Sequence, residues 1–188
     1  PSLARMINQQ IHSLPRPVKW FSVPRLCRAE RPQKGRLREF FQWNIDIIGD
    51  DSPLADAESI FTAIDYLRSV GLTSGDVVAK ISSRSLLAAW LKELGAAPQE
   101  LDTIYALLDK RAKLPEETFQ ALAVEKIPEA GLRTKILDLF QIDSFEKLKT
   151  SAPPAAQEEV ARLDTLFHLL EVMGVRDYCT FDIHIVRG

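Results

Sequence analysis

The chain has 188 residues, of which 46% are hydrophobic and 27% charged, a composition that excludes a disordered protein and allows one full core or two small ones. The 24 Lys and Arg residues nearly balance the 26 Asp and Glu residues, so the formal charge of −2 excludes a uniformly basic nucleic-acid or membrane binder. Cys27 and Cys179 are too few for a disulfide scaffold and lack metal-ligand spacing. We predict that both are small buried side chains.

No segment approaches the roughly 20 apolar residues that a membrane span requires, and the N-terminus lacks the order of a signal peptide. We therefore expect a cytoplasmic location and no membrane contact. The chain begins at Pro1 without a methionine and stops at Gly188 directly after an apolar run. These ends predict a fragment of a longer chain.

Two extended segments near the N-terminus predict a β-hairpin. Val18–Arg28 and Arg36–Ile48 are rich in aromatic and β-branched residues, and a short segment with Pro32 and Gly35 can turn the chain between them. A helix is predicted over residues 54–70, because Asp51-Ser52-Pro53 supplies a cap and a first-turn proline. Residues 77–82 are predicted to form a short strand.

From residue 84 to 175, apolar residues recur at helical spacing, and prolines divide the segment into several predicted helices. A strand-like run then returns at 179–186. This order predicts an α+β fold, an antiparallel sheet with flanking helices and an all-helical insertion. We place the sheet-containing core at 1–83, the helical insertion at 84–178 and the return strand at 179–188, and a separate all-helical domain is the alternative.

Positive charge is concentrated in the predicted hairpin. Residues 25–39 carry a net charge of +4, whereas the rest of the chain carries −6. Guanidinium groups on two hairpin arms are planar bidentate donors of the kind that phosphate oxygens favour. The segment therefore predicts a phosphate clamp, whose basic residues are Arg25, Arg28, Arg31, Lys34, Arg36 and Arg38.

Strand alternation assigns the side chains of the second arm to two faces. The odd face is predicted to be core and carries Leu37, Phe41, Trp43, Ile45 and Ile47. The even face is a polar row that carries Arg36, Arg38, Gln42, Asn44 and Asp46, with Phe40 among them. At about 3.3 Å per residue, Gln42 and Asp46 lie roughly 13 Å apart. Arginines at one end and a carboxylate at the other suit a zwitterion joined to a nucleotide.

Two other interpretations of the basic segment remain open. Charged side chains on an exposed edge hairpin prevent aggregation, and a basic hairpin can also contact the phosphates of RNA. Neither explains why the polar row continues through Gln42 and Asn44 to Asp46.

The run from Arg28 to Gln42 has the pattern ERPQ-x-GR-x-R-x-F-x-Q and is followed by Asn44, Asp46 and Gly49. This run resembles motif 2 of the class II aminoacyl-tRNA synthetases, in the form used by the histidyl-tRNA synthetase family. Further similarities are Arg5, Asp56-Ala-Glu58, Ile81-Ser-Ser-Arg84 and the terminal run from Phe181 to Gly188. The resemblance implies that histidine and ATP, with Mg²⁺, give histidyl-adenylate, and that the histidyl group then passes to tRNA(His).

The resemblance also implies residue roles. Arg28 would bind the ATP α-phosphate and the histidine carboxylate, and Arg187 would stabilise the α-phosphate in the transition state; these two are the expected catalytic residues. Glu30 would position adenine, and Arg36 would reach the outer phosphates. Gln42 and Asp46 would contact the histidine amino group and nearby polar atoms, and Arg187 is also an expected histidine-binding residue.

Partners follow from the same resemblance: histidine, tRNA(His) contacted by the helical insertion, and a second copy in a homodimer. Because motif 1, motif 3 and the anticodon-binding domain are not in the sequence, we expect the fragment itself to be inactive. One alternative is a catalytically inactive paralogue, such as the regulatory subunit of ATP phosphoribosyltransferase. Another is a nonenzymatic RNA-binding module.

Histidines and tryptophans give weaker indications. His12, His168 and His184 share no ligand spacing, so we expect no resident metal. Trp20, Trp43 and Trp90 are predicted to be core residues. Alternation along the predicted last strand puts Arg187 on the apolar side, so its implied role requires that the strand ends or bulges first.

Overall fold

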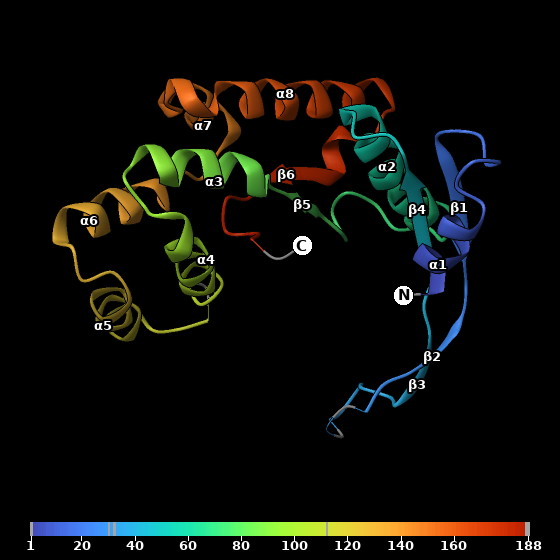
Figure 1. The fold of residues 1–188 in the computed structure, drawn as a ribbon, viewed down its shortest axis with the longest axis horizontal. Coiled ribbons are helices and arrows are strands. Elements are labelled where there is room, and N and C mark those ends of the chain that lie inside the picture. The colour runs from blue at the N-terminus through green and yellow to red at the C-terminus, as the bar shows by residue number, and fades with distance from the viewer. Residues whose placement is uncertain (1, 30, 32, 112, 187–188) are drawn as a thin grey trace. The chain divides into compact units, whose positions relative to one another are not determined.

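The computed structural model describes residues 2–29, 31, 33–111 and 113–186. The chain forms two compact units that divide between Thr62 and Ala63, within helix α2. Both contain helices and small two-stranded sheets (Figure 1), which confirms the predicted α+β fold class. Within the described residues, no helix combines the length and apolar character needed to cross a lipid bilayer.

The first unit is built around one long β-hairpin. Its elements are α1 (Ser2–Gln9), β1 (Val18–Ser22), β2 (Arg25–Cys27), β3 (Glu39–Phe41), β4 (Asn44–Ile48) and the first part of α2 (Pro53–Ser69). β1 pairs antiparallel with β4, and β2 pairs antiparallel with β3.

The two ladders are parts of one hairpin, because they share the same register with no inserted residue between them. At their junction the Gln42 N–H donates to the Pro24 carbonyl over 3.3 Å. Pro24 has no N–H to donate in return, and regular strand pairing is interrupted there. Beyond β2, the Arg28 N–H donates to the Arg38 carbonyl over 2.9 Å. The predicted hairpin is confirmed.

The prediction that the odd face is core is wrong for the outer part of the hairpin. Phe41 is 72% exposed, Leu37 is 70% exposed and Trp43 is 40% exposed. At its base Ile45 and Ile47 are half-buried, and Lys19, which is opposite Ile47, forms an ion pair with Glu58 of α2. At the base α1 also packs against the even face, where Ile7, Val18 and Ile48 line a common apolar hollow. Alternation therefore sorts the side chains into two faces, but the helices that pack against the hairpin decide which part of each face is covered.

Helix α2 begins where its cap residues predict. The Ser52 Oγ accepts a hydrogen bond from the Ala55 N–H over 3.4 Å, and the Asp50 carboxylate accepts one from the Ser52 N–H over 2.9 Å. The backbone and side-chain hydrogen bonds of Ser52 hold the pKa of Asp50 below its usual value. The predicted helix over 54–70 agrees with the observed Pro53–Ser69 to within one residue at each end.

Gly49, between β4 and this cap, has a φ of +88°, and a Cβ there would lie 3.4 Å from the Cδ of Arg16. Because L-residues rarely adopt this backbone conformation, we expect Gly49→Ala to lower the free energy of unfolding by about 1–2 kcal/mol. Equilibrium denaturation measures this change. Gly75→Ala is the control, since Gly75 lacks a positive φ, and equal effects of the two substitutions would contradict the expectation.

The second unit combines one strand pair with a block of helices. Its elements are the rest of α2, β5 (Ala79–Ile81), α3 (Arg84–Glu93), α4 (Leu101–Leu108), α5 (Glu116–Lys126), α6 (Ala130–Leu139), α7 (Phe145–Ser151), α8 (Gln157–Val172) and β6 (Cys179–Phe181), with short 3-10 turns at Pro98–Glu100, Pro154–Ala156 and Arg176–Tyr178. β5 and β6 pair in parallel, with Ala79 opposite Cys179. The two ends of the helical block therefore meet at this strand pair (Figure 1).

Apolar side chains from α3 to α8 form the core of this unit. α3 and α7 pack against α8, while α5 packs against α4 and α6. The helical period predicted for residues 84–175 is confirmed, and Trp90 is buried as predicted. Fully buried helix residues include Leu86, Leu87, Leu91, Leu107, Leu108, Phe119, Ile136, Leu148 and Leu170.

The predicted last strand, 179–186, is wrong beyond Phe181. The Asp182 carboxylate accepts a hydrogen bond from the His184 N–H over 3.0 Å, and the Asp182 carbonyl accepts one from the Ile185 N–H over 3.2 Å. An aspartate that bonds the backbone two residues later turns the chain instead of continuing a ladder. Strand alternation consequently stops before Arg187, which itself lies outside the described residues.

Candidate functional site

Arg28, Gln42 and Asp46 lie on the same face of the hairpin. Arg28 is level with Arg38, Gln42 is level with Pro24, and Asp46 is directly opposite Trp20. Side chains at directly paired positions share a face, and faces alternate along each strand. Because the register is uninterrupted, all three residues belong to the even face.

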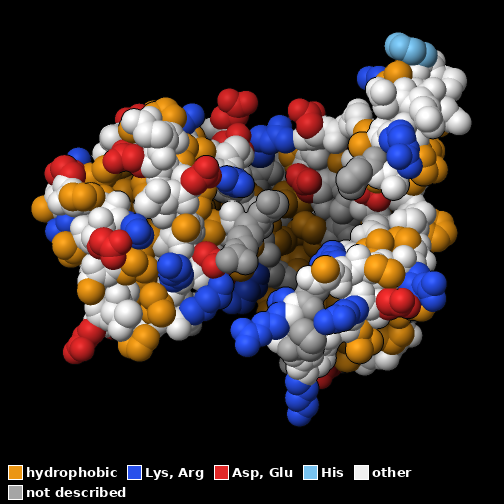
Figure 2. Space-filling model, turned by 60° about the horizontal axis from the view of Figure 1, so that its bottom comes forward, with side chains coloured by type: hydrophobic (Ala, Val, Ile, Leu, Met, Phe, Trp, Pro, Cys, Tyr) orange, Lys and Arg blue, Asp and Glu red, His pale blue; other side chains and the backbone are white. Residues whose placement is uncertain are grey.

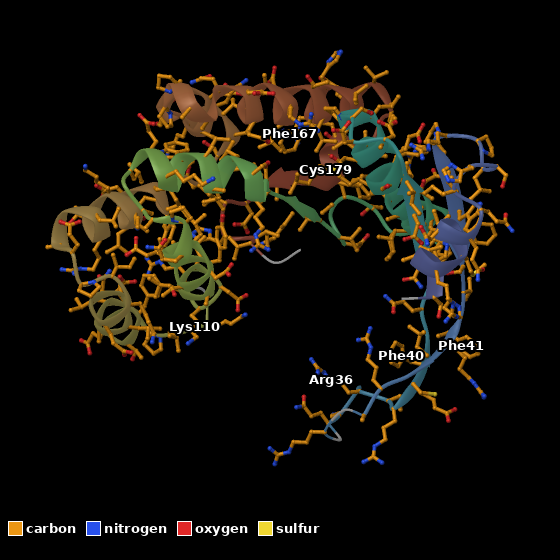
Figure 3. The ribbon with its side chains drawn as sticks, viewed as in Figure 1. Arg36, Phe40, Phe41, Lys110, Phe167 and Cys179 are labelled. Atoms are coloured by element: carbon orange, nitrogen blue, oxygen red, sulfur yellow. The ribbon has the colours of Figure 1, made fainter. Side chains whose placement is uncertain are left out.

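At one end of this row, near the hairpin tip, is an open hollow of about 510 Å³ lined by Arg28, Gly35, Arg36, Leu37 and Phe40. The Arg28 guanidinium carbon lies 5.0 Å from the centre of the Phe40 ring, a cation–π distance. Figure 3 shows Phe40 and Phe41 on opposite sides of β3. An aromatic face beside guanidinium groups can stack a planar heterocycle and bind its phosphates.

The hairpin tip brings Arg36 to the same hollow. The Arg36 N–H donates to the Gln33 carbonyl over 3.0 Å, and Gly35 has a φ of +80° that permits the tight turn. Lys and Arg side chains project from the end of the hairpin in Figure 2. The clamp predicted from six basic residues is divided, however, because Arg25 lies on the odd face and forms an ion pair with Glu39 at 3.7 Å.

Gln42 and Asp46 form the other part of the row. Gln42 is exposed, while Asp46 is half-buried in β4. The Asn44 amide between them donates to the Gln42 carbonyl over 3.4 Å. By strand geometry the levels of Arg28, Gln42 and Asp46 are each about 13 Å apart, so the row is about 26 Å long.

Two predicted site residues, Glu30 and Arg187, lie outside the described residues. Their roles remain predictions. The sequence analysis placed Phe40 on the polar face of the hairpin but predicted no function for it. Its position could have indicated a role, because an aromatic residue diagonal to Arg28 lies within reach of that side chain across the two strands.

The side chains that line the hollow do not fit a metal ion. Among the described lining residues the charged groups are the guanidinium groups of Arg28 and Arg36, whereas Mg²⁺ binds oxygen ligands. The hollow therefore favours an anion.

The two cysteines differ, and this corrects the prediction that both are buried. Cys27 is exposed on β2 next to Arg28, whereas Cys179 is buried, and burial raises the pKa of the Cys179 thiol. At β2 the odd face of the hairpin is uncovered, so the odd-numbered side chains of this strand are exposed. Since thiolate formation and access control thiol reactivity, we expect iodoacetamide to label Cys27 rapidly and Cys179 only after denaturation.

Mass spectrometry of peptides labelled under native conditions measures this difference. Cys27→Ser is the control, which should lose the rapid label. Rapid labelling of Cys179 in the folded chain would contradict the packing around β6.

Comparisons of the sequence with a family model and with known relatives agree on one family. The family model described as histidyl-tRNA synthetase matches residues 1–188. The histidine–tRNA ligase of Leptospira biflexa is 34% identical over 189 residues, which is 100% of this chain and 43% of the relative. The chloroplastic/mitochondrial histidine–tRNA ligase of Arabidopsis thaliana is 35% identical over 100% of this chain and 38% of the relative. The chain thus spans less than half the length of these relatives.

Two solved structures have the same fold. The histidyl-tRNA synthetase from Nostoc sp. PCC 7120 aligns with a TM-score of 0.81 and 23% identity, over 99% of this chain and 44% of that one. A protein from Bacillus halodurans C described as an ATP phosphoribosyltransferase regulatory subunit/histidyl-tRNA synthetase aligns with a TM-score of 0.81 and 19% identity, over 98% of this chain and 48% of that one. With the match of the family model to the whole sequence, these findings show that the chain belongs to the histidyl-tRNA synthetase family.

Proposed function

We propose that this chain carries part of the active site of a histidine–tRNA ligase, which activates histidine with ATP and transfers the histidyl group to tRNA(His). The observation that carries the proposal is the placement of Arg28, Gln42 and Asp46 on one hairpin face, with Arg28 over the Phe40 ring at the anionic end. Relatives named histidine–tRNA ligase at 34–35% identity support the same activity.

In the first step, an oxygen of the histidine carboxylate attacks the α-phosphorus of ATP, the bond to the bridging oxygen breaks, and pyrophosphate leaves. The reaction needs no covalent protein nucleophile, and fixed positive groups stabilise the charge that builds on the α-phosphate. Arg28 and Arg187 would supply that charge, and Arg36 would bind the outer phosphates. Gln42 and Asp46 would bind the histidine amino group and neighbouring polar atoms.

In the second step, a hydroxyl of the terminal ribose of the tRNA attacks the histidyl carbonyl, and AMP leaves. Adenine would lie against Phe40, positioned by Glu30. We place the catalytic core at 1–83 and 179–188, with the helical segment 84–178 as an insertion that contacts tRNA. The full-length protein would act as a homodimer and use ATP with Mg²⁺.

A second function has one observation in its favour, the structural likeness to the Bacillus halodurans protein with a regulatory-subunit description. Arg187 disfavours it, since a subunit that only senses histidine needs no second phosphate-directed arginine. Histidine-dependent ATP–pyrophosphate exchange by the full-length protein tests the two. Exchange supports the ligase, and histidine binding without exchange supports a regulatory subunit.

A nonenzymatic RNA-binding module makes a different prediction. Its RNA binding would be strongly salt-dependent and unchanged in Gln42→Ala and Asp46→Ala, because RNA phosphates would contact only the basic residues. The ligase proposal expects both substitutions to reduce histidine affinity.

A further inference from the structure

Trp20 lies on the even face of the hairpin, at the Asp46 end of the polar row. It is directly opposite Asp46 in the pairing of β1 with β4. Side chains at directly paired positions share a face, with about 4.5–5.5 Å between their Cβ atoms. The sequence predicts that Trp20 is a core residue, but its side chain is only half-buried. Part of the indole is therefore accessible beside the carboxylate.

This pair of side chains lies at a boundary along the even face. On one side are Val18 and Ile48, which are opposite each other and line the apolar hollow next to α1. On the other side are Ser22 and Asn44, which are also opposite each other. Successive side chains on one face of a strand are about 6.6 Å apart, so both sets are immediate neighbours of the pair. The pair therefore joins an apolar surface to a row of hydrogen-bonding groups.

The Asp46 carboxylate is open to a ligand. Asp46 is half-buried in β4, and within the part of the chain that the structure describes its carboxylate has no hydrogen-bond or ion-pair partner. Carboxylates that are removed from solvent are usually paired with a donor. A ligand that donates a hydrogen bond to Asp46 and packs an apolar face against Trp20 would satisfy both side chains.

The imidazole of histidine has both of the properties that this pair requires. In the neutral imidazole one ring nitrogen carries a hydrogen that it can donate, and the ring faces pack favourably against another aromatic ring. Glutamine and asparagine could also donate to a carboxylate through their side-chain amides, but they have no ring to pack against the indole. The pair therefore favours an amino acid with a flat, hydrogen-bonding side chain.

We propose that Trp20 is a specificity-determining residue: its indole is the wall against which the side-chain ring of the bound histidine packs, while the edge of that ring donates to Asp46. This inference rests on the proposed function. It gives Trp20 no part in the chemistry at the α-phosphate, because Trp20 is level with Asp46 and Arg28 is at the other end of the row. Its effect would be on which amino acid binds.

The test is ATP–pyrophosphate exchange by the full-length protein, with histidine and ATP varied in turn. We expect Trp20→Ala to raise the KM for histidine by about tenfold, through loss of one aromatic pair, and to leave the KM for ATP within about twofold. Trp20→Phe keeps a flat ring and should lie much nearer to wild type. Trp43→Ala is the matched control and should leave both KM values near those of the wild type, since Trp43 lies on the odd face of the same hairpin and is 40% exposed.

Tryptophan fluorescence gives a reading that a merely structural role would not move. Addition of histidine should change the emission of the wild-type and Trp43→Phe proteins, and this change should be lost in Trp20→Phe. An unchanged KM for histidine in Trp20→Ala, or equal increases in both KM values, would overturn the inference while the proposed function stands. If Trp20→Ala fails to fold, Trp20→Leu, which keeps apolar bulk without a flat ring, is measured with the same expectation. Absence of exchange in the wild-type protein would overturn both the inference and the proposed function.

Discussion

Replacement of Arg28 with alanine is expected to reduce histidine-dependent ATP–pyrophosphate exchange by about a hundredfold or more, the usual effect of removing one preorganised charge-stabilising donor. The guanidinium lies over Phe40 and lines the hollow at the hairpin tip together with Arg36. Loss of Arg28 removes the positive charge next to the position we propose for the α-phosphate. The measurement is the exchange rate of the full-length protein at saturating histidine and ATP.

Arg25 provides a matched control, because it lies on the same strand but on the opposite face, paired with Glu39. Arg25→Ala should retain nearly wild-type exchange. Arg28→Lys keeps the charge but not the planar bidentate geometry, so an intermediate rate is expected. An Arg28→Ala protein with unchanged exchange would show that the phosphate clamp is placed wrongly.

Asp46→Ala is expected to raise the KM for histidine by about ten- to a hundredfold, because a hydrogen bond to a charged group contributes about 1.5–3 kcal/mol and each 1.4 kcal/mol is a tenfold change. The KM for ATP should change much less, since Asp46 is at the far end of the row from Arg28 and Arg36. Steady-state exchange kinetics with each substrate varied in turn would measure both constants.

Glu39→Ala is the control for Asp46, as it removes a carboxylate from the odd face of the same arm. Both KM values should remain near those of the wild-type protein. Asp46→Asn retains the shape and an acceptor oxygen, so its KM for histidine should lie between those of the wild type and Asp46→Ala. Equal increases in both KM values for Asp46→Ala would indicate a general loss of structure and contradict the assigned role.

The hairpin, α2 and the helices of the second unit could be predicted from the sequence because their signals are local. Alternation, a cap with Ser52 and Pro53, and repeated apolar residues each act over a few neighbouring positions. The common face of Arg28, Gln42 and Asp46 also follows from local rules, since parity is preserved when two ladders share one register.

Features that depend on distant contacts could not be predicted. The exposure of Phe41 and Trp43 depends on how far along the odd face a helix packs, and strand parity carries no information on that. The end of β6 depends on whether the Asp182 carboxylate bonds its own backbone or solvent. The contact of His184 with Phe140 joins residues 44 positions apart, and no local pattern in the sequence indicates it.

The most direct test of the central proposal is a crystal structure of the full-length protein with a nonhydrolysable histidyl-adenylate analogue. We predict that the analogue lies along the even face of the hairpin, with its phosphate-like group bonded to Arg28, its adenine against Phe40 and its amino group bonded to Gln42 or Asp46. An analogue bound elsewhere, or one that contacts Arg28 while Gln42 and Asp46 remain in solvent, would contradict the proposal.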